Sequence, residues 1–288
     1  MKGQHFQKVN LLSPNNYYFA SVKIYQRFEL GEQITPEQHQ FYNEFGFIHY
    51  KNFISQEEVE KLLAAIQELE QKWINEGVTK VNGIPLRFGN DTDGKKIIHR
   101  FAFASVYSEA LHNFLQDKRL GLLLGFMPKR SRIVEEGKDG MVVSHYINDG
   151  HSNYTQLGWH TDALRDIFQG FHVNPMINVG ISLDDSPKEK GGLRVLPGSH
   201  KQTQFELLFK KKYFFDNTPD KEEFIIETEA GDLTLHHGRI WHRVALATVE
   251  GEASRRRMMY FPIIAGKYKP KSEKSRTPIY HKFHHLVK

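Results

Sequence analysis

The stretch 176-MINVGISLDDSPKEKGGLRVL-196 contains two short apolar runs, residues 176–183 and 192–196, with an acidic turn and a pair of glycines between them. Short runs rich in Val and Ile that are bounded by Gly, Pro, Asn or Asp are typical of β-strands. Such runs in close succession predict a barrel or a jelly roll, here over about residues 140–265. Further strands of this kind are expected at 141–147, 223–227, 232–236 and 257–264.

The residues before this β-rich core have the features of helices. Thr35-Pro36-Glu37 combines an N-cap residue, a proline in the first helical turn and an acidic residue beside it. Ser55 and Glu58 form a capping box, and apolar residues follow at helical spacing. We therefore predict that residues 34–130 are mainly helical and that residues 1–288 form a single domain. Helices are expected at 35–44, at 55–73 and within 103–127, and a strand at 47–50.

Composition narrows the class of protein and the chemistry of any metal site. With 39% hydrophobic and 25% charged residues, the 288-residue chain has the balance of a globular protein. It contains no cysteine, which excludes disulfides and thiolate metal sites, so a metal must be held by His, Asp or Glu. The N-terminal residues lack an apolar signal segment, and no run approaches the ~20 apolar residues of a membrane helix. We therefore expect a cytoplasmic protein without a membrane partner.

The last residues are strongly basic. Residues 267–288 contain seven Lys or Arg residues and one Glu, and the chain as a whole has a formal net charge of +5. Such a tail could contact nucleic acid or acidic lipid. A solvated, loosely ordered terminus is the more common role of a short charged tail, and it is the interpretation that we favour. Nucleic acid is therefore not an expected partner, and no feature of the sequence predicts an oligomeric state.

The segment Gly158-Trp159-His160-Thr161-Asp162 places a histidine and a carboxylate two residues apart. Residues i and i+2 of a strand point to the same face, so both side chains can reach one metal ion. A third ligand is expected from 231-GDLTLHHGRIWH-242, where we prefer His242 and keep His236 and His237 as alternatives. Two histidines and one carboxylate that leave further positions open are typical of non-haem iron(II) oxygenases.

These motifs together resemble those of the phytanoyl-CoA dioxygenase family. "LGWHTD" is similar to its first metal-binding segment, "ISLDDSPKEKGGLRVLPGSHK" to its central strands and turns, and "GDLTLHHGRIWHR" to the segment that supplies the last ligand. The resemblance extends over about residues 34–264. It implies a double-stranded β-helix, which is a cupin-like jelly roll, with iron(II), 2-oxoglutarate and O₂ as cofactor and co-substrates. It also implies that His160, Asp162 and His242 bind the iron.

The resemblance further implies residues that bind 2-oxoglutarate. In the family an arginine shortly after the last histidine pairs with the far carboxylate, and the family pattern aligns best with Arg256. Arg255 and Arg257 are the alternatives, and the period of a strand places both of them on the opposite face from Arg256. His145 falls near a family cofactor-contact position. Gly180 stands where many members have a tryptophan, so that wall of the pocket is either open or filled from elsewhere.

The expected reaction is hydroxylation of a small molecule, coupled to oxidative decarboxylation of 2-oxoglutarate to succinate and CO₂. The presence of Asp162 favours hydroxylation over halogenation, because related halogenases lack this carboxylate. The substrate cannot be identified from the sequence. We expect loop 163–175, which includes Arg165, Asp166, Phe168 and His172, to line the substrate entrance. Trp159 and Trp241 are expected to pack beside the ligands and to fix their strands.

Two other functions are compatible with parts of the sequence. A zinc hydrolase could use the same His160, Asp162 and His242 set, because zinc with an open position accepts these ligands. A non-catalytic binding protein that uses the basic tail is the third possibility, although no aromatic and basic recognition motif accompanies that tail. Of the three, the oxygenase is the one expected to decarboxylate 2-oxoglutarate with iron(II), so this reaction distinguishes it from the zinc hydrolase and from the binding protein.

Overall fold

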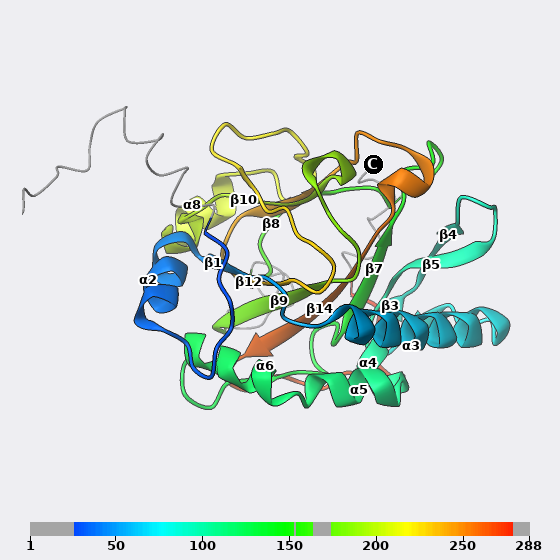
Figure 1. Cartoon of the computed structure of the whole chain (residues 1–288), viewed down its shortest axis with the longest axis horizontal. Coiled ribbons are helices and arrows are strands. Elements are labelled where there is room, and N and C mark those ends of the chain that lie inside the picture. The colour runs from blue at the N-terminus through cyan, green and yellow to red at the C-terminus, as the bar shows by residue number, and fades with distance from the viewer. Residues whose placement is uncertain (1–25, 153, 164–173, 279–288) are drawn as a thin grey trace, which may run out of the picture.

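The computed structural model describes residues 26–152, 154–163 and 174–278. Two antiparallel sheets dominate it (Figure 1). The larger has the strand order β1-β12-β9-β14-β7-β5-β4, with β6 pairing with β14, and the smaller has the order β11-β10-β13-β8. Strands that are distant in the sequence are thus neighbours in space, as a jelly roll requires, and the predicted fold class is confirmed.

The larger sheet is formed by β1 (Phe47–Tyr50), β4 (Arg87–Asn90), β5 (Lys96–Phe101), β6 (Arg132–Ile133), β7 (Val142–Tyr146), β9 (Met176–Ser182), β12 (Leu233–His237) and β14 (Arg256–Ile264). The smaller sheet is formed by β8 (Leu157–His160), β10 (Gly192–Val195), β11 (Phe224–Ile225) and β13 (His242–Ala245). A separate two-stranded sheet joins β2 (Lys80–Val81) to β3 (Ile84–Pro85). All six strands that were predicted within residues 140–265 are present.

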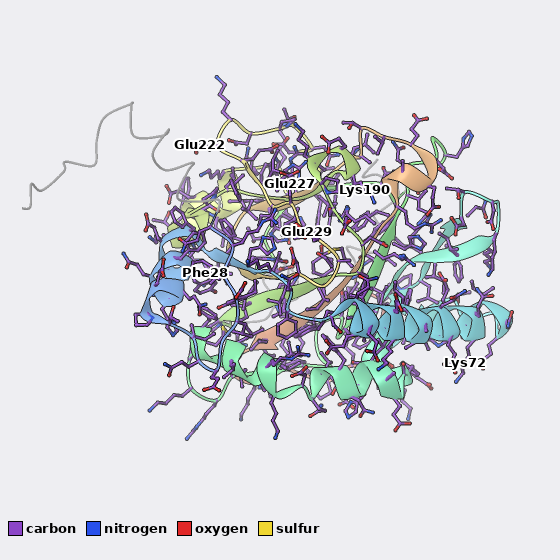
Figure 2. The ribbon with its side chains drawn as sticks, viewed as in Figure 1. Phe28, Lys72, Lys190, Glu222, Glu227 and Glu229 are labelled. Atoms are coloured by element: carbon purple, nitrogen blue, oxygen red, sulfur yellow. The ribbon has the colours of Figure 1, made fainter. Side chains whose placement is uncertain are left out.

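Helices cover the edges and the outer face of the larger sheet. The α-helices are α2 (Pro36–Phe45), α3 (Gln56–Asn75), α4 (Ala104–Tyr107), α5 (Glu109–Leu115), α6 (Lys118–Leu122) and α8 (Gln204–Phe209). The 3₁₀ helices are η2 (Leu123–Phe126), η3 (Lys188–Lys190), η4 (Ser199–Lys201) and η5 (Gly251–Ser254). Thr35 and Ser55 cap α2 and α3 through the predicted capping geometry, and Gly46 ends α2 at φ 80°. Phe28, which is labelled in Figure 2, packs edge-on against Phe41 of α2, and the ring centroids are 5.2 Å apart.

The predicted helical character of residues 34–130 needs a correction. β1 lies where a strand was predicted, at 47–50, but β4 and β5 also lie within this range, and all three belong to the larger sheet. The segment 103–127 is helical as predicted, and contains three short α-helices and a 3₁₀ helix. One hydrophobic core nevertheless unites the helices with the larger sheet, from Phe28 to Ile263. The prediction of a single domain stays a prediction.

Part of the basic tail packs against the domain. Tyr268 contacts a small apolar cluster formed by Val134, Met176 and Ile264. The ammonium group of Lys271 lies 3.6 Å from Asp139, which is buried. Residues 267–278 are therefore not the loosely ordered terminus that we expected, and residues 279–288 lie outside the described part of the chain. No described helix is both long and apolar enough to span a bilayer.

Candidate metal centre

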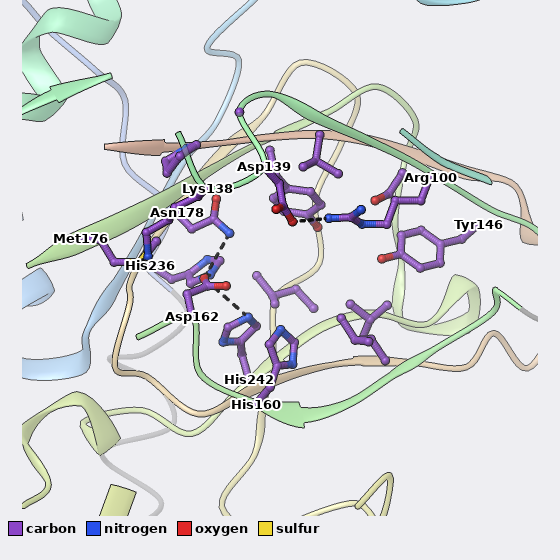
Figure 3. A pocket seen from close by; sticks show the side chains of 18 of the residues that line it. Arg100, Lys138, Asp139, Tyr146, His160, Asp162, Met176, Asn178, His236 and His242 are labelled. Carbon is purple, nitrogen blue, oxygen red and sulfur yellow. Dashed lines mark hydrogen bonds and ion pairs between the residues drawn. The ribbon is translucent and has the colours of Figure 1, made fainter. Parts of the chain in front are cut away.

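The smaller sheet brings the three predicted ligands together. His160 is the last residue of β8 and His242 the first residue of β13, and these two residues are direct partners across the antiparallel pair. Their ring centroids are 4.1 Å apart. Asp162 follows two residues after His160, and the potential ligand atoms of all three side chains lie within 4.8 Å of one another. Figure 3 shows the three buried side chains at one side of a cavity between the sheets.

Two details of this arrangement differ from the expectation. β8 ends at His160, so Asp162 reaches the site from the residues that follow the strand. β12 ends at His237, and a turn then carries the chain to β13, so His242 begins a new strand instead of ending the Gly231-Asp232 strand. The third ligand is therefore placed by the pairing of β13 with β8, which the sequence alone does not reveal.

Hydrogen bonds fix the orientation of both imidazoles. The Nδ1 atom of His160 lies 2.8 Å from the carbonyl oxygen of Gly158, and that of His242 lies 3.1 Å from the carbonyl oxygen of Ile240. A carbonyl only accepts, so each Nδ1 holds the proton and each Nε2 keeps its lone pair for a metal. Burial and the neighbouring His160 and His236 lower the pKa of His242 well below its ordinary value. Two neutral imidazoles and a carboxylate are a fitting donor set for iron(II).

The two alternative histidines take different positions. His237 faces away from the cavity, and its ring lies 5.2 Å from that of His200. Its Nδ1 atom accepts a hydrogen bond from the backbone of Arg239. His236 faces the cavity, with Nε2 3.4 Å from Oδ2 of Asp162. Within the described residues, the group that could hold a metal consists of His160, Asp162 and His242.

Arg256 is a buried cation with unused hydrogen-bond donors. Only 1% of its surface is exposed, and its guanidinium lies 4.2 Å from the ring centroid of Tyr146. Its Nε and Nη2 atoms have no hydrogen-bond partner among the described residues. Tyr146 lines the cavity, and so does Tyr260, which shares a face of β14 with Arg256. A bound carboxylate would satisfy these donors, which fits the expected role of Arg256 towards 2-oxoglutarate.

Arg257, on the other face of β14, and Arg255, which directly precedes the strand, are both paired with acidic side chains. Arg257 forms two side-chain hydrogen bonds with Asp184, at 2.6 and 2.8 Å. Arg255 forms ion pairs with Asp91 and Glu252. The predicted division of the three arginines between two faces is therefore confirmed.

The expectation for His145 is corrected. β7 presents Val142, Ser144 and Tyr146 to the cavity, and so His145 points to the outer face. There its Nε2 atom lies 2.7 Å from Nη1 of Arg255. It therefore cannot contact a cofactor in the cavity from this position. Its neighbours Ser144 and Tyr146 line the cavity instead.

Tyrosines that the sequence did not single out form one wall of the cavity. The rings of Tyr146 and Tyr154 stack at 4.8 Å, and both line the cavity. Tyr260 fills the space beside Gly180, because a Cβ atom on Gly180 would lie 2.8 Å from the Tyr260 ring. The wall that a tryptophan would form is thus filled from elsewhere. At the far end of the cavity Arg100 pairs with Asp139 at 2.7 Å (Figure 3).

The remaining predictions concern residues around the ligands. Trp159 and Trp241 are fully buried and pack together with Leu196 and Leu207, so their predicted packing role is confirmed. Loop 163–175 falls mostly outside the described residues. That includes the four side chains expected at the substrate entrance, namely Arg165, Asp166, Phe168 and His172.

Comparison with known proteins decides the family. Residues 42–245, most of the chain, match the phytanoyl-CoA dioxygenase (PhyH) family. The chain belongs to this family. The resemblance predicted from the motifs is therefore confirmed, and with it the enzyme class, a dioxygenase that uses iron and 2-oxoglutarate.

Two named relatives of this chain are distant from it in sequence. A "Probable alpha-ketoglutarate-dependent hypophosphite dioxygenase" of Stutzerimonas stutzeri is 23% identical over 217 residues, which cover 72% of this chain and 71% of that enzyme. An ectoine dioxygenase of Bordetella parapertussis is 20% identical over 191 residues, which cover 62% of this chain but only 54% of that enzyme.

Solved structures share the fold. The α-ketoglutarate-dependent carbocyclase SnoK from nogalamycin biosynthesis superposes with a TM-score of 0.61 at 18% identity, over 88% of this chain and 90% of SnoK. HygX from Streptomyces hygroscopicus, with nickel and 2-oxoglutarate bound, gives 0.59 at 19% identity, over 82% and 89% of the two chains. At these identities the likeness concerns the fold alone.

Proposed function

We propose that this protein is an iron(II)- and 2-oxoglutarate-dependent dioxygenase that hydroxylates a small molecule and releases succinate and CO₂. His160, Asp162 and His242 hold the iron, and Arg256 holds the far carboxylate of 2-oxoglutarate. One observation supports this assignment above the others. Two imidazoles, each with its Nδ1 atom held by a backbone carbonyl, converge with a carboxylate beside a cavity that also adjoins a buried, incompletely paired arginine.

Each residue has a separate task in this proposal. Bound iron with 2-oxoglutarate and O₂ supplies the oxidative chemistry. The backbone carbonyls of Gly158 and Ile240 fix the proton on Nδ1 of the two histidines and orient both rings, so that Nε2 is the nitrogen that would bind the metal. Arg256 orients the co-substrate through a planar, permanently charged guanidinium. The two sheets enclose the site and exclude bulk water.

The cavity favours a small substrate. Its volume is about 110 Å³, well below the roughly 300–1,000 Å³ of pockets for drug-sized ligands. Its lining combines aromatic and aliphatic side chains with polar and charged ones, and the Arg100–Asp139 pair lies at the end away from the metal ligands. We therefore propose a small metabolite with a polar group as the substrate, and not a bulky acyl-CoA ester. The absence of cysteine leads us to propose a cytoplasmic location.

The test of this function is succinate formation by the purified protein. With iron(II), O₂ and 2-oxoglutarate we expect succinate, at a rate that rises when the correct small molecule is added from a metabolite library. With zinc in place of iron we expect none. Hydrolysis of a test ester with zinc, without turnover of 2-oxoglutarate, would instead support the zinc hydrolase and contradict the proposal.

A further inference from the structure

Two guanidinium groups and two phenol rings form a stack across the larger sheet. The guanidinium of Arg256 lies 4.2 Å from the ring centroid of Tyr146, whose ring stacks on that of Tyr154 at 4.8 Å and an interplanar angle of 12°. The guanidinium of Arg87 lies 5.3 Å from the centroid of Tyr154. Arg256 is on β14, Tyr146 on β7 and Arg87 on β4, which is their order across the sheet. Tyr154 therefore lies between the side chains of β7 and β4.

Arg87 is a partly buried cation at the outer end of this stack. It pairs with no acidic side chain among the described residues, and its direct neighbour across the β4–β5 pair is another cation, Arg100. Burial lowers the pKa of Arg87, and the charge of Arg100 acts in the same direction. The face of the Tyr154 ring is within cation–π distance, so it supplies a favourable contact for this charge.

At the inner end, the stack constrains the arginine that we assign to 2-oxoglutarate. Nε and Nη2 of Arg256 have no hydrogen-bond partner among the described residues, although the hydroxyl of Tyr260 interacts with the guanidinium. The plane of the guanidinium is therefore set largely by packing on Tyr146. That plane matters, because a guanidinium binds a carboxylate through two parallel hydrogen bonds only when the two groups are coplanar.

Tyr154 could also act through its hydroxyl group. This hydroxyl lies 3.4 Å from that of Tyr146 and 3.2 Å from Oγ of Ser144, and all three residues line the cavity. Figure 3 shows Tyr146 at the same end of the cavity as Arg100. A phenylalanine at position 154 keeps the ring and removes the hydroxyl, so it distinguishes stacking from hydrogen bonding.

We propose that Arg87 and Tyr154 are positioning residues that hold Tyr146, and through it Arg256, in the orientation that binds the far carboxylate of 2-oxoglutarate. This inference rests on the proposed function. Arg87 does not line the cavity, so it would act on the co-substrate without touching it. Cation–π and aromatic stacking contacts each correspond to about a 2- to 10-fold change in a binding constant.

The experiment measures equilibrium binding of 2-oxoglutarate to the iron(II)-loaded protein without O₂, by isothermal titration calorimetry. Tyr154→Leu should weaken binding by about 3- to 10-fold and Arg87→Met by about 2- to 5-fold. Tyr154→Phe should bind within about twofold of the wild type, because the stack is kept. Iron(II) binding should stay at the wild-type level in all three variants, because none of them changes a metal ligand.

The matched control is Lys96→Met. Lys96 also places a cation over a ring of the β4–β5 hairpin, that of Phe88 at 4.3 Å, but neither residue lines the cavity or contacts the stack. This variant should bind 2-oxoglutarate as the wild type does. A weakening as large as that in Arg87→Met would assign the effect to the hairpin as a whole and overturn the inference.

Coupling to Arg256 separates a positioning role from a structural one. In an Arg256→Ala background, Tyr154→Leu and Arg87→Met should weaken binding no further, because the group that they position is gone. An equal loss in both backgrounds, or an equal loss in Tyr154→Phe and Tyr154→Leu, would overturn the inference, as would wild-type affinity in Arg87→Met or Tyr154→Leu. If Tyr154→Leu does not fold, Arg87→Met decides alone. Failure of the wild type to bind 2-oxoglutarate with iron(II) present would instead contradict the proposed function.

Discussion

Arginine side chains on the two faces of the larger sheet differ in how completely they are hydrogen-bonded. On the cavity face, Arg256 is buried with two nitrogen atoms that lack a hydrogen-bond partner among the described residues. On the outer face, Arg255 and Arg257 are each paired with acidic side chains. A buried guanidinium without complete hydrogen bonding is costly, and for this reason we propose that a ligand completes it. In this proposal the outer face contributes to stability and the cavity face to binding.

The largest effect should follow from loss of a metal ligand on the cavity side. We expect His160→Ala or Asp162→Ala to abolish iron-dependent succinate formation, because either change removes one of three ligands. The variants should stay folded, since the buried ligands are not part of the main hydrophobic core. Succinate assays and circular dichroism test this. Turnover at the wild-type rate in either variant would remove these residues from the mechanism.

The next largest effect should distinguish Arg256 from the neighbouring Arg255 and Arg257. Arg256→Ala removes a buried charged partner of the co-substrate, worth roughly 2–5 kcal/mol, which corresponds to an increase of about 30-fold or more in KM for 2-oxoglutarate. Arg255→Ala and Arg257→Ala should leave that KM within about twofold of the wild type. A strong rise of KM in either of these two variants, with Arg256→Ala unaffected, would reverse the assignment of the faces.

The arginines also show how far the sequence can be interpreted. Period-two geometry correctly separates Arg256 from its neighbours, because that rule needs only the strand itself. The same rule could not place His145, because its face depends on the pairing of Arg257 with His145 across β14 and β7. Strand register between distant segments depends on tertiary packing, which local patterns do not contain.

Other differences have similar causes. The strands β4 and β5 escaped prediction because charged residues interrupt them, for example Lys96 and Arg100 on β5. His242, which we preferred as the third ligand, lies beside His160 and Asp162, but its position at the start of β13 follows from a turn after β12. The tyrosine wall and the contacts of Asn178 and His236 with Asp162 arise only when four strands pack together. The family motifs therefore predicted the candidate ligands, and the structure shows which residues surround them.

Acidification should have a moderate effect that comes from buried and half-buried histidines outside the cavity. Burial lowers the pKa of His145 to about 3 and the pKa values of His200 and His237 to about 4. In the unfolded chain they titrate near 6.5, so between about pH 6.5 and 4 the unfolded state binds more protons. The free energy of unfolding should therefore fall as the pH drops through this range.

Urea unfolding at several pH values tests this expectation. His145→Gln, on the outer face, should reduce the pH dependence and leave the KM for 2-oxoglutarate unchanged. Stability that does not vary between pH 7 and 4.5 would contradict the burial of these histidines in the neutral form. A large rise of the KM for 2-oxoglutarate in His145→Gln would instead indicate that this residue contacts the co-substrate.

The smallest effect should come from the paired outer face. Burial alone would raise the pKa of Asp184, but hydrogen bonds and charge from Arg257 keep it below its ordinary value. Asp184→Asn weakens this partly exposed pair and should lower the free energy of unfolding by about 1–2 kcal/mol. Denaturant unfolding measures the change, and succinate formation should stay at the wild-type level. A lost activity with unchanged stability would assign the outer pair a role in catalysis.

The most direct test of the central claim is the visible charge-transfer absorption that iron(II) gives when a 2-oxo acid chelates it, measured without O₂. The account predicts that this band appears when iron(II) and 2-oxoglutarate are added to the wild-type protein, and that His242→Ala shows none. A wild-type protein without the band, or a His242→Ala variant with a band of full intensity, would contradict an iron site formed by His160, Asp162 and His242.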